Sequence, residues 1–188
     1  MTQPGPADTA VVVYTAGTTG KPEGAELTHI GLYMNADLPA RLVGVYPTDI
    51  VLTVLPLFHV FGLSSALNIC VRFGCTMSLV PRWDARTVLA TIERDKCTIF
   101  DGVPAMFAEL MACPDLDRYD VSSLRLAVSS GASIPGPLLD AFEERFGVLI
   151  LEGYGMTETT ATTTQNLATG ERRHYGCFLF KKGVLPPE

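Results

Sequence analysis

Residues 10–28 read Ala-Val-Val-Val-Tyr-Thr-Ala-Gly-Thr-Thr-Gly-Lys-Pro-Glu-Gly-Ala-Glu-Leu-Thr, a β-branched run followed by a loop of glycines, hydroxyls and one lysine. Residues 11–13 predict a buried strand, because consecutive valines favour extended backbone. In the loop that follows, the glycines let the backbone come close to an anion, and N–H groups, hydroxyls and a positive charge can bind that anion. The residues that supply these groups are Thr15, Gly17, Thr18, Thr19, Gly20 and Lys21. The stretch therefore predicts a phosphate-binding loop.

The spacing excludes a Walker A loop. That motif needs four residues between its glycines and a Ser or Thr directly after its lysine. Here two residues separate Gly17 from Gly20, and Pro22 follows Lys21. An ordinary Gly-rich hairpin turn stays open as the alternative for this loop taken alone.

Residues 14–24 closely resemble the signature loop of the AMP-forming adenylating enzymes, which include acyl-CoA synthetases, firefly-type luciferases and the adenylation domains of peptide synthetases. In that family the loop joins two strands and holds the outer phosphates of ATP, and the resemblance implies this role for Thr18, Thr19 and Lys21. The sequence departs from the family pattern at Ala16, which replaces a hydroxyl residue, and at Glu23, which replaces a lysine. We expect the negative charge of Glu23 to repel the polyphosphate.

A second specific motif, Gly-Tyr-Gly-Met-Thr-Glu at residues 153–158, follows a predicted strand at residues 148–151. The Tyr154 ring can stack on a purine, Thr157 can donate to a phosphate, and Glu158 is a hard oxygen ligand suited to magnesium. The motif resembles the adenine and magnesium motif of the same family. The resemblance implies nucleotide contacts for Gly153, Tyr154, Gly155 and Thr157, and a metal-binding, catalytic role for Glu158. The alternative is a surface turn leading into a threonine-rich run.

Three weaker motifs lie between these two, in the family's order. Residues 56–62 resemble the motif that borders the acyl pocket, and residues 101–104 resemble the turn beside that pocket. Residues 129–135 resemble the loop whose backbone lies against adenine. By this resemblance His59, Phe61, Gly102 and Val103 belong to a substrate pocket, and Gly131 and Ala132 to the nucleotide site.

Each weaker motif has a plain structural alternative. A histidine among apolar residues is usually a core or surface side chain, residues 101–104 alone are only a turn, and Gly131 can serve merely to permit a turn. A metal role for His59 is disfavoured, since His29 and His174 lie at no ligand-like spacing from it. Only the order and number of the motifs favour the functional reading.

Composition narrows the class of protein. The 188 residues suffice for one domain, and a net charge of -6 gives no basic footprint for nucleic acid. Five cysteines without a C-x-x-C pair predict neither a disulfide framework nor a zinc site, and favour a reducing cytoplasm. Residues 50–71 contain no Asp, Glu, Lys or Arg, but Pro56, His59 and Gly62 interrupt them, so we expect no transmembrane segment.

Strand and helix patterns alternate along the chain. Strands are predicted at residues 25–28, 50–55, 75–80, 97–100, 125–129 and 148–151. Helices are predicted at residues 29–43, where Leu32, Leu38 and Leu42 supply apolar contacts, and at residues 104–111. Further helices are predicted from Val60, after an Asp84 cap, and between a Ser133 cap and Gly147. This alternation predicts an α/β fold with a mostly parallel sheet flanked by helices, as in part of the N-terminal domain of adenylate-forming enzymes. Ligands are expected at the carboxyl ends of the strands.

The predicted organisation is a flexible segment at residues 1–9, a partial adenylation domain at residues 10–166 and an atypical tail at residues 167–188. The resemblance implies ATP-dependent activation of a carboxylic acid to acyl-adenylate and then to acyl-CoA, with ATP, magnesium and CoA. The similarity of residues 83–166 to fatty-acid CoA ligases implies that the acid is a fatty acid. The resemblance also implies that this chain is inactive alone, because the family's ribose-binding aspartate and lysine-bearing domain have no counterpart. Self-association through exposed apolar surface is expected. The alternatives are a non-catalytic remnant that retains a nucleotide-shaped pocket, and an unrelated phosphate-binding α/β protein.

Overall fold

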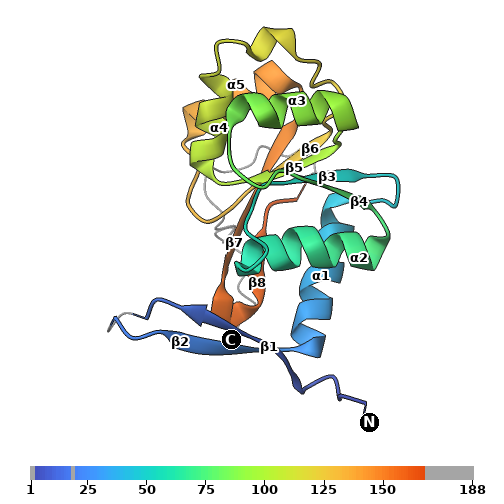
Figure 1. Ribbon diagram of the computed structural model, residues 1–188, viewed down its shortest axis with the longest axis vertical. Helices are drawn as coiled ribbons and strands as arrows, with labels where there is room; N and C mark the ends of the chain where they lie inside the picture. The colour runs from blue at the N-terminus through green and yellow to red at the C-terminus, as the bar shows by residue number, and fades with distance from the viewer. Residues whose placement is uncertain (1–2, 18–19, 168–188) are drawn as a thin grey trace, which may run out of the picture.

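A computed structural model describes residues 3–17 and 20–167 and centres on a six-stranded sheet in the order β4-β3-β5-β6-β7-β8 (Figure 1). The strands are β3 (Ile50–Thr53), β4 (Thr76–Leu79), β5 (Ile99–Gly102), β6 (Leu126–Ser129), β7 (Leu149–Met156) and β8 (Ala161–Gln165). All neighbours are parallel except β7 and β8, which are antiparallel. The predicted mostly parallel sheet is confirmed.

Helices cover both faces of the sheet, because successive strand residues point to opposite faces. They are α1 (His29–Val43), α2 (Ile69–Phe73), α3 (Ala85–Asp95), α4 (Pro104–Met111) and α5 (Gly136–Phe146), with the π-helix η1 (Gly62–Asn68) and the 3-10 turns η2 (Leu116–Arg118) and η3 (Thr157–Thr159). Leu52, Phe100, Ala127 and Ile150 pack with α3, α4 and α5. Their neighbours Val51, Ile99, Leu126 and Leu151 pack with α1 and α2 on the other face (Figure 1).

The predicted helices are largely confirmed. The bounds of α1 and α4 are as predicted, and the Asp84 carboxylate caps α3 by accepting from the Thr87 N–H at 2.8 Å. Two expectations are wrong. Ser133 is not a cap, since α5 begins after Pro135 without a side-chain hydrogen bond. Leu38 and Leu42 lie on the outer face of α1 and are 50% and 56% exposed.

Two corrections to the strand predictions bear on the site. β1 (Thr9–Thr15) is not buried, because it forms an antiparallel hairpin with β2 (Glu23–Thr28) outside the main sheet and leaves Val12 44% exposed. β7 does not end at Leu151 but continues to Met156, so residues 153–156 lie in a strand and not in a turn. Its antiparallel partner β8 was not predicted.

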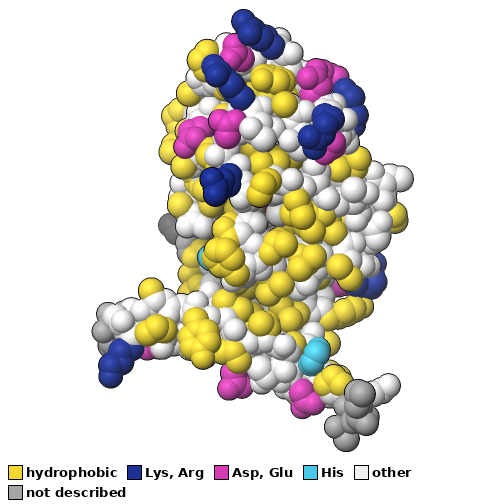
Figure 2. All heavy atoms as spheres, in the orientation of Figure 1, with side chains coloured by type: hydrophobic (Ala, Val, Ile, Leu, Met, Phe, Trp, Pro, Cys, Tyr) yellow, Lys and Arg dark blue, Asp and Glu magenta, His cyan; other side chains and the backbone are white. Residues whose placement is uncertain are grey.

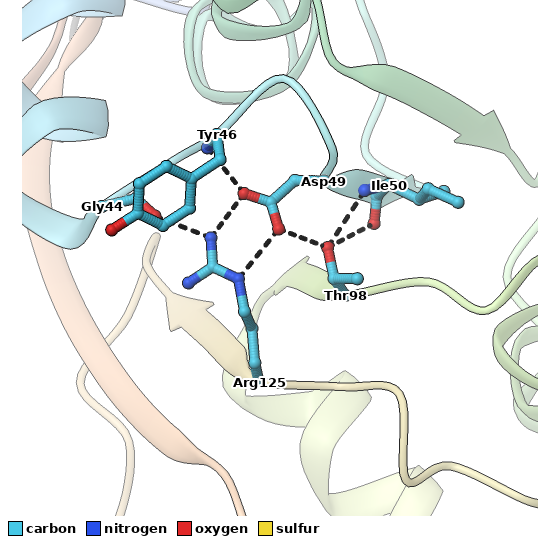
Figure 3. A network of polar contacts seen from close by, with 6 residues as sticks. All are labelled: Gly44, Tyr46, Asp49, Ile50, Thr98 and Arg125. Atoms are coloured by element: carbon cyan, nitrogen blue, oxygen red, sulfur yellow. Dashed lines mark hydrogen bonds and ion pairs between the residues drawn. The ribbon is translucent and has the colours of Figure 1, made fainter.

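A buried carboxylate joins three elements at the amino ends of the strands. Asp49, 3% exposed, receives the Tyr46 N–H at 2.7 Å, the Thr98 hydroxyl at 2.7 Å and Nε of Arg125 at 2.8 Å (Figure 3). Arg125 also donates to the Gly44 carbonyl at 2.7 Å. Burial by itself raises the pKa of Asp49, but the hydrogen bonds from Arg125, Tyr46 and Thr98 bring it below its ordinary value. This network ties the end of α1 to β3 and β6.

Apolar and charged side chains gather in different parts of the surface. Figure 2 shows charged residues mainly over the α3–α5 layer and hydrophobic residues over the α1, α2 and hairpin region. The exposed apolar side chains there include Val12, Tyr33, Leu38, Leu42 and Val71. Among the described residues, none of the helices combines the length and the apolar character that a membrane span requires.

Candidate functional site

Segments from three parts of the chain meet in a pocket at the carboxyl ends of the parallel strands. Its walls include His59, Phe61, Ser130, Gly131, Gly155 and Thr162, and we call it the His59 pocket. Four of these residues, His59, Phe61, Gly131 and Gly155, were predicted site residues. Motifs separated by up to about half of the chain thus share one pocket, as expected for a site at this edge of an α/β sheet.

Gly155 is required by the pairing of β7 with β8. A Cβ atom at this position would lie 1.4 Å from the Ala161 carbonyl oxygen, far inside van der Waals contact. Gly155 pairs with Thr162 just beyond a register shift after Tyr154. The glycine therefore lets β8 close over the pocket, and Tyr154 is left 40% exposed beside it.

The loop at residues 130–135 is held in place by a carboxylate that sequence reasoning missed. Glu152 on β7 is 3% exposed and accepts the Ile134 N–H at 3.0 Å. Gly131 has φ +84, a conformation that side chains disfavour. A Cβ on Gly131 would lie 3.4 Å from Cγ1 of Val103, so this predicted pocket residue adjoins the loop.

Asn35 of α1 is a second positioning residue that the sequence did not reveal. Its amide nitrogen donates to the carbonyls of Thr159 at 3.4 Å and Thr162 at 3.2 Å, and its oxygen accepts the Thr162 N–H at 2.7 Å. These bonds fix the connection between η3 and β8. In the sequence Asn35 is one of several polar residues in this helix, beside Asp37 and Arg41, so nothing singled it out.

His59 is exposed, and its Nδ1 accepts the Phe61 N–H at 3.1 Å. A neutral imidazole that accepts at Nδ1 carries its proton on Nε2. His59 is therefore oriented as an Nε2 donor at the pocket wall.

The phosphate-loop prediction lies on the β1–β2 hairpin. Thr15 ends β1, Gly17 and Gly20 have φ +65 and +80, and Lys21 is exposed. Thr18 and Thr19 lie outside the described residues. β2 packs against η3, which carries Thr157 and Glu158, so the strand that follows the loop lies beside the second motif.

Glu158 is exposed, and among residues 3–17 and 20–167 it forms no ion pair or hydrogen bond. No group of three or more His, Cys, Asp or Glu in those ranges could hold a metal ion. A single free carboxylate fits magnesium, which is commonly held by one or two carboxylates together with substrate phosphates. Glu158 could complete such a site only with a bound nucleotide.

Gly102 and Ala132 are among the predicted residues that do not line the pocket. A Cβ on Gly102 would meet the Phe100 and Phe107 rings at 2.9 and 3.3 Å, so this glycine faces the α3–α5 core. Ala132 is exposed in the loop after Gly131. Neither lines the His59 pocket.

An apolar cavity adjoins the His59 pocket and shares Phe61, Ser130 and Thr162 with it. It lies between the sheet and the layer of α1 and η1. Its walls include Val43, Phe61, Ile69, Ile99, Leu126 and one carboxylate, Asp101, and we call it the Asp101 cavity. The two hollows therefore lie side by side.

Comparison with known proteins identifies similar chains. A family model described as AMP-binding enzyme matches residues 1–182. A long-chain-fatty-acid–CoA ligase of Bacillus subtilis (strain 168) is 35% identical over 168 residues, which are 88% of this chain and 30% of that enzyme.

Solved structures agree with this similarity. The inhibitor-bound N-terminal domain of FACL13 from Mycobacterium tuberculosis gives a TM-score of 0.82 at 28% identity, over 89% of this chain and 42% of that one. The O-succinylbenzoate coenzyme A synthetase of Bacillus subtilis, in complex with ATP and magnesium ion, gives 0.75 at 35% identity, over 87% of this chain and 33% of that one. The chain thus spans well under half the length of these relatives.

Proposed function

The chain belongs to the AMP-binding enzyme family, and on that premise we propose that it binds ATP at the His59 pocket and a carboxylic acid with its chain in the Asp101 cavity. The proposed reaction joins a carboxylate oxygen of the acid to the α-phosphorus of ATP as pyrophosphate leaves. The thiol of CoA then attacks the acyl carbonyl and AMP leaves. This chain spans less than half of these relatives, so the whole reaction is a proposal that goes beyond the part seen here.

The observation that carries the proposal is the meeting of the motifs. The His59 segment, the Gly131 loop and Gly155 line one pocket, and the hairpin packs against the turn of Glu158. In the proposed complex these segments supply donors to the phosphate on which charge increases during the reaction, which is the usual way in which such sites lower a barrier.

Each group has a proposed task. Lys21 and the hairpin backbone attract the outer phosphates, Thr157 donates to the α-phosphate, and Tyr154 stacks on adenine. The His59 Nε2–H borders the acid carboxylate. Glu158 would hold magnesium, which neutralises phosphate charge when bound.

Calorimetric titration of the chain with ATP and magnesium, with and without a fatty acid, tests the proposal. We expect saturable nucleotide binding and a separate acid-binding isotherm. Absence of both would contradict the proposed function.

Glu158→Gln is expected to weaken magnesium-dependent ATP binding by about 10-fold or more, since even outer partners of a metal site have effects of that size. The change is nearly isosteric, so the fold should persist. Titrations with and without magnesium measure the effect. Glu144→Gln, at an exposed position of α5, is the control and should leave binding unchanged. Equal magnesium dependence in all three proteins would remove Glu158 from the metal site.

Glu23→Lys is expected to strengthen the binding of ATP more than that of AMP, because it replaces repulsion of the outer phosphates by attraction. Each pair of charges near contact in water contributes about 1 kcal/mol. The gain should shrink with salt, which screens exposed charges over roughly 8 Å at physiological ionic strength. Glu26→Lys makes the same change of charge on the opposite face of β2 and serves as the control. An equal gain for ATP and AMP would place residue 23 away from the outer phosphates.

Two further expectations stay proposals. The exposed apolar side chains of α1 and the hairpin support self-association of this chain. The four cysteines in the described part of the chain are free thiols, which supports a reducing, cytoplasmic location.

A further inference from the structure

The Asp101 cavity has a carboxylate in an apolar wall. Asp101 lies at the carboxyl end of β5, on the same face as Ile99, and is 2% exposed. Among the described residues that line the cavity it is the only charged one, and most of the others are aliphatic. A carboxylate at such a place is costly unless something compensates for it.

Nothing in the described part of the protein compensates for it. No hydrogen bond or ion pair within residues 3–17 and 20–167 involves Asp101. By contrast, the buried carboxylate of Asp49, just before the neighbouring strand β3, accepts four hydrogen bonds. Burial raises the pKa of Asp101 to about 7. The nearby Cys70 and Cys75 are themselves thiols whose pKa is raised, first of all by burial, so neither is a counter-charge.

The same face of the sheet holds a second polar atom without a partner. Thr53 pairs in register with Asp101, and its buried hydroxyl has no hydrogen bond to any described residue. Buried polar groups in native proteins are nearly always paired, and Asp101 and Thr53 have no partner among the described protein atoms, so a group outside these atoms can pair with them. The cavity beside Asp101 is where that partner can sit.

We propose that Asp101 determines substrate specificity by accepting a hydrogen bond from a donor group, a hydroxyl or an amine, carried on the chain of the acid. This assignment rests on the proposed function, in which the acid chain occupies the Asp101 cavity. Plain hydrocarbon chains would leave the carboxyl unpaired. A site with a buried acceptor rejects analogues that lack the donor, as polar specificity pockets do.

The test compares octanoic and decanoic acids with their terminal hydroxyl and terminal amino derivatives, in calorimetric titrations of the full 188-residue chain. We expect at least one donor-bearing acid to bind about 10-fold or more tightly than its parent. Asp101→Leu should reverse this preference, because it supplies an apolar wall. Asp101→Asn should keep the preference for the hydroxyl acid and lose any preference for the ammonium acid.

The outcomes separate this inference from the function on which it rests. Parent and donor-bearing acids that bind equally to the wild type, or an unchanged preference in Asp101→Leu, would overturn the specificity role and leave the proposed function standing. If the wild-type protein binds ATP but none of the acids, both the proposed acid site and the specificity role of Asp101 are wrong. Circular dichroism of each variant checks that the fold persists.

Discussion

Asp49→Ala is expected to lower the free energy of unfolding by about 3 kcal/mol, the low end of the range for breaking a buried ion pair. Asp49 receives donors from Tyr46, Thr98 and Arg125, all of which lose their acceptor (Figure 3). The low end is appropriate because the Arg125 side chain is 36% exposed and water can solvate it, whereas the Asp49 side chain is 4% exposed.

Urea unfolding followed by circular dichroism measures this effect. Asp117→Ala, which removes an exposed partner of Arg145, is the matched control and should cost less than about 1 kcal/mol. The pKa of Asp49 is lower in the folded protein than in the unfolded chain, where it is near 4. The ionised Asp49 therefore adds to the free energy of unfolding above pH 4, and this contribution is lost as the pH falls through the pKa of the folded state. The difference between wild type and Asp49→Asn should therefore narrow in acid. A cost equal to that of the control would show that the network is not a structural support.

The central fold was predictable because parallel strands buried on both faces appear as apolar runs. Strand ends were less predictable. The strand predicted at residues 97–100 begins two residues later, because Thr98 is engaged with Asp49 and the Ile50 backbone at the sheet margin. A local pattern does not contain that contact between distant residues.

The candidate site was predictable where a motif carries its own chemistry, as at the hairpin and at residues 153–158. The extension of β7 through Gly153 and Gly155 was not predictable, because glycines ordinarily indicate turns. Only the close approach of Ala161 explains why a strand needs Gly155. Asn35 and Glu152 act on backbone groups far along the chain, so their roles follow from the tertiary structure alone.

Asp101 illustrates the same limit. In the sequence it begins a turn motif, and nothing there says toward which face it points. The register of β5 with β3 and β6 places it on the α1 side, beside Thr53 and Val128 and within an apolar cavity. Its carboxyl is therefore both a candidate specificity group and a source of instability in the unliganded chain.

Asp101→Leu is expected to raise the free energy of unfolding at pH 8 by up to about 4 kcal/mol, because three pKa units correspond to that energy. Burial raises the pKa of Asp101 from 3.8 to about 7 in the folded protein. Between these values the folded state holds a proton that the unfolded state has released. Wild-type stability should therefore fall as pH rises from about 4 to about 7 and then level off.

Urea unfolding of both proteins at pH values from 5 to about 8.5 measures this difference. All other titrating groups are common to the two proteins, so their effects on the free energy of unfolding cancel in the comparison. Cys70 and Cys75, the neighbouring titratable groups, have raised pKa values and stay neutral over this range. Glu144→Gln on exposed α5 is the control and should run parallel to the wild type. The Asp101→Leu difference should grow between pH 5 and pH 7 and then level off, because the ionised carboxylate is costlier to bury than the neutral acid. A constant difference across the range would mean that leucine acts through packing, and that Asp101 is not held unpaired in the folded chain.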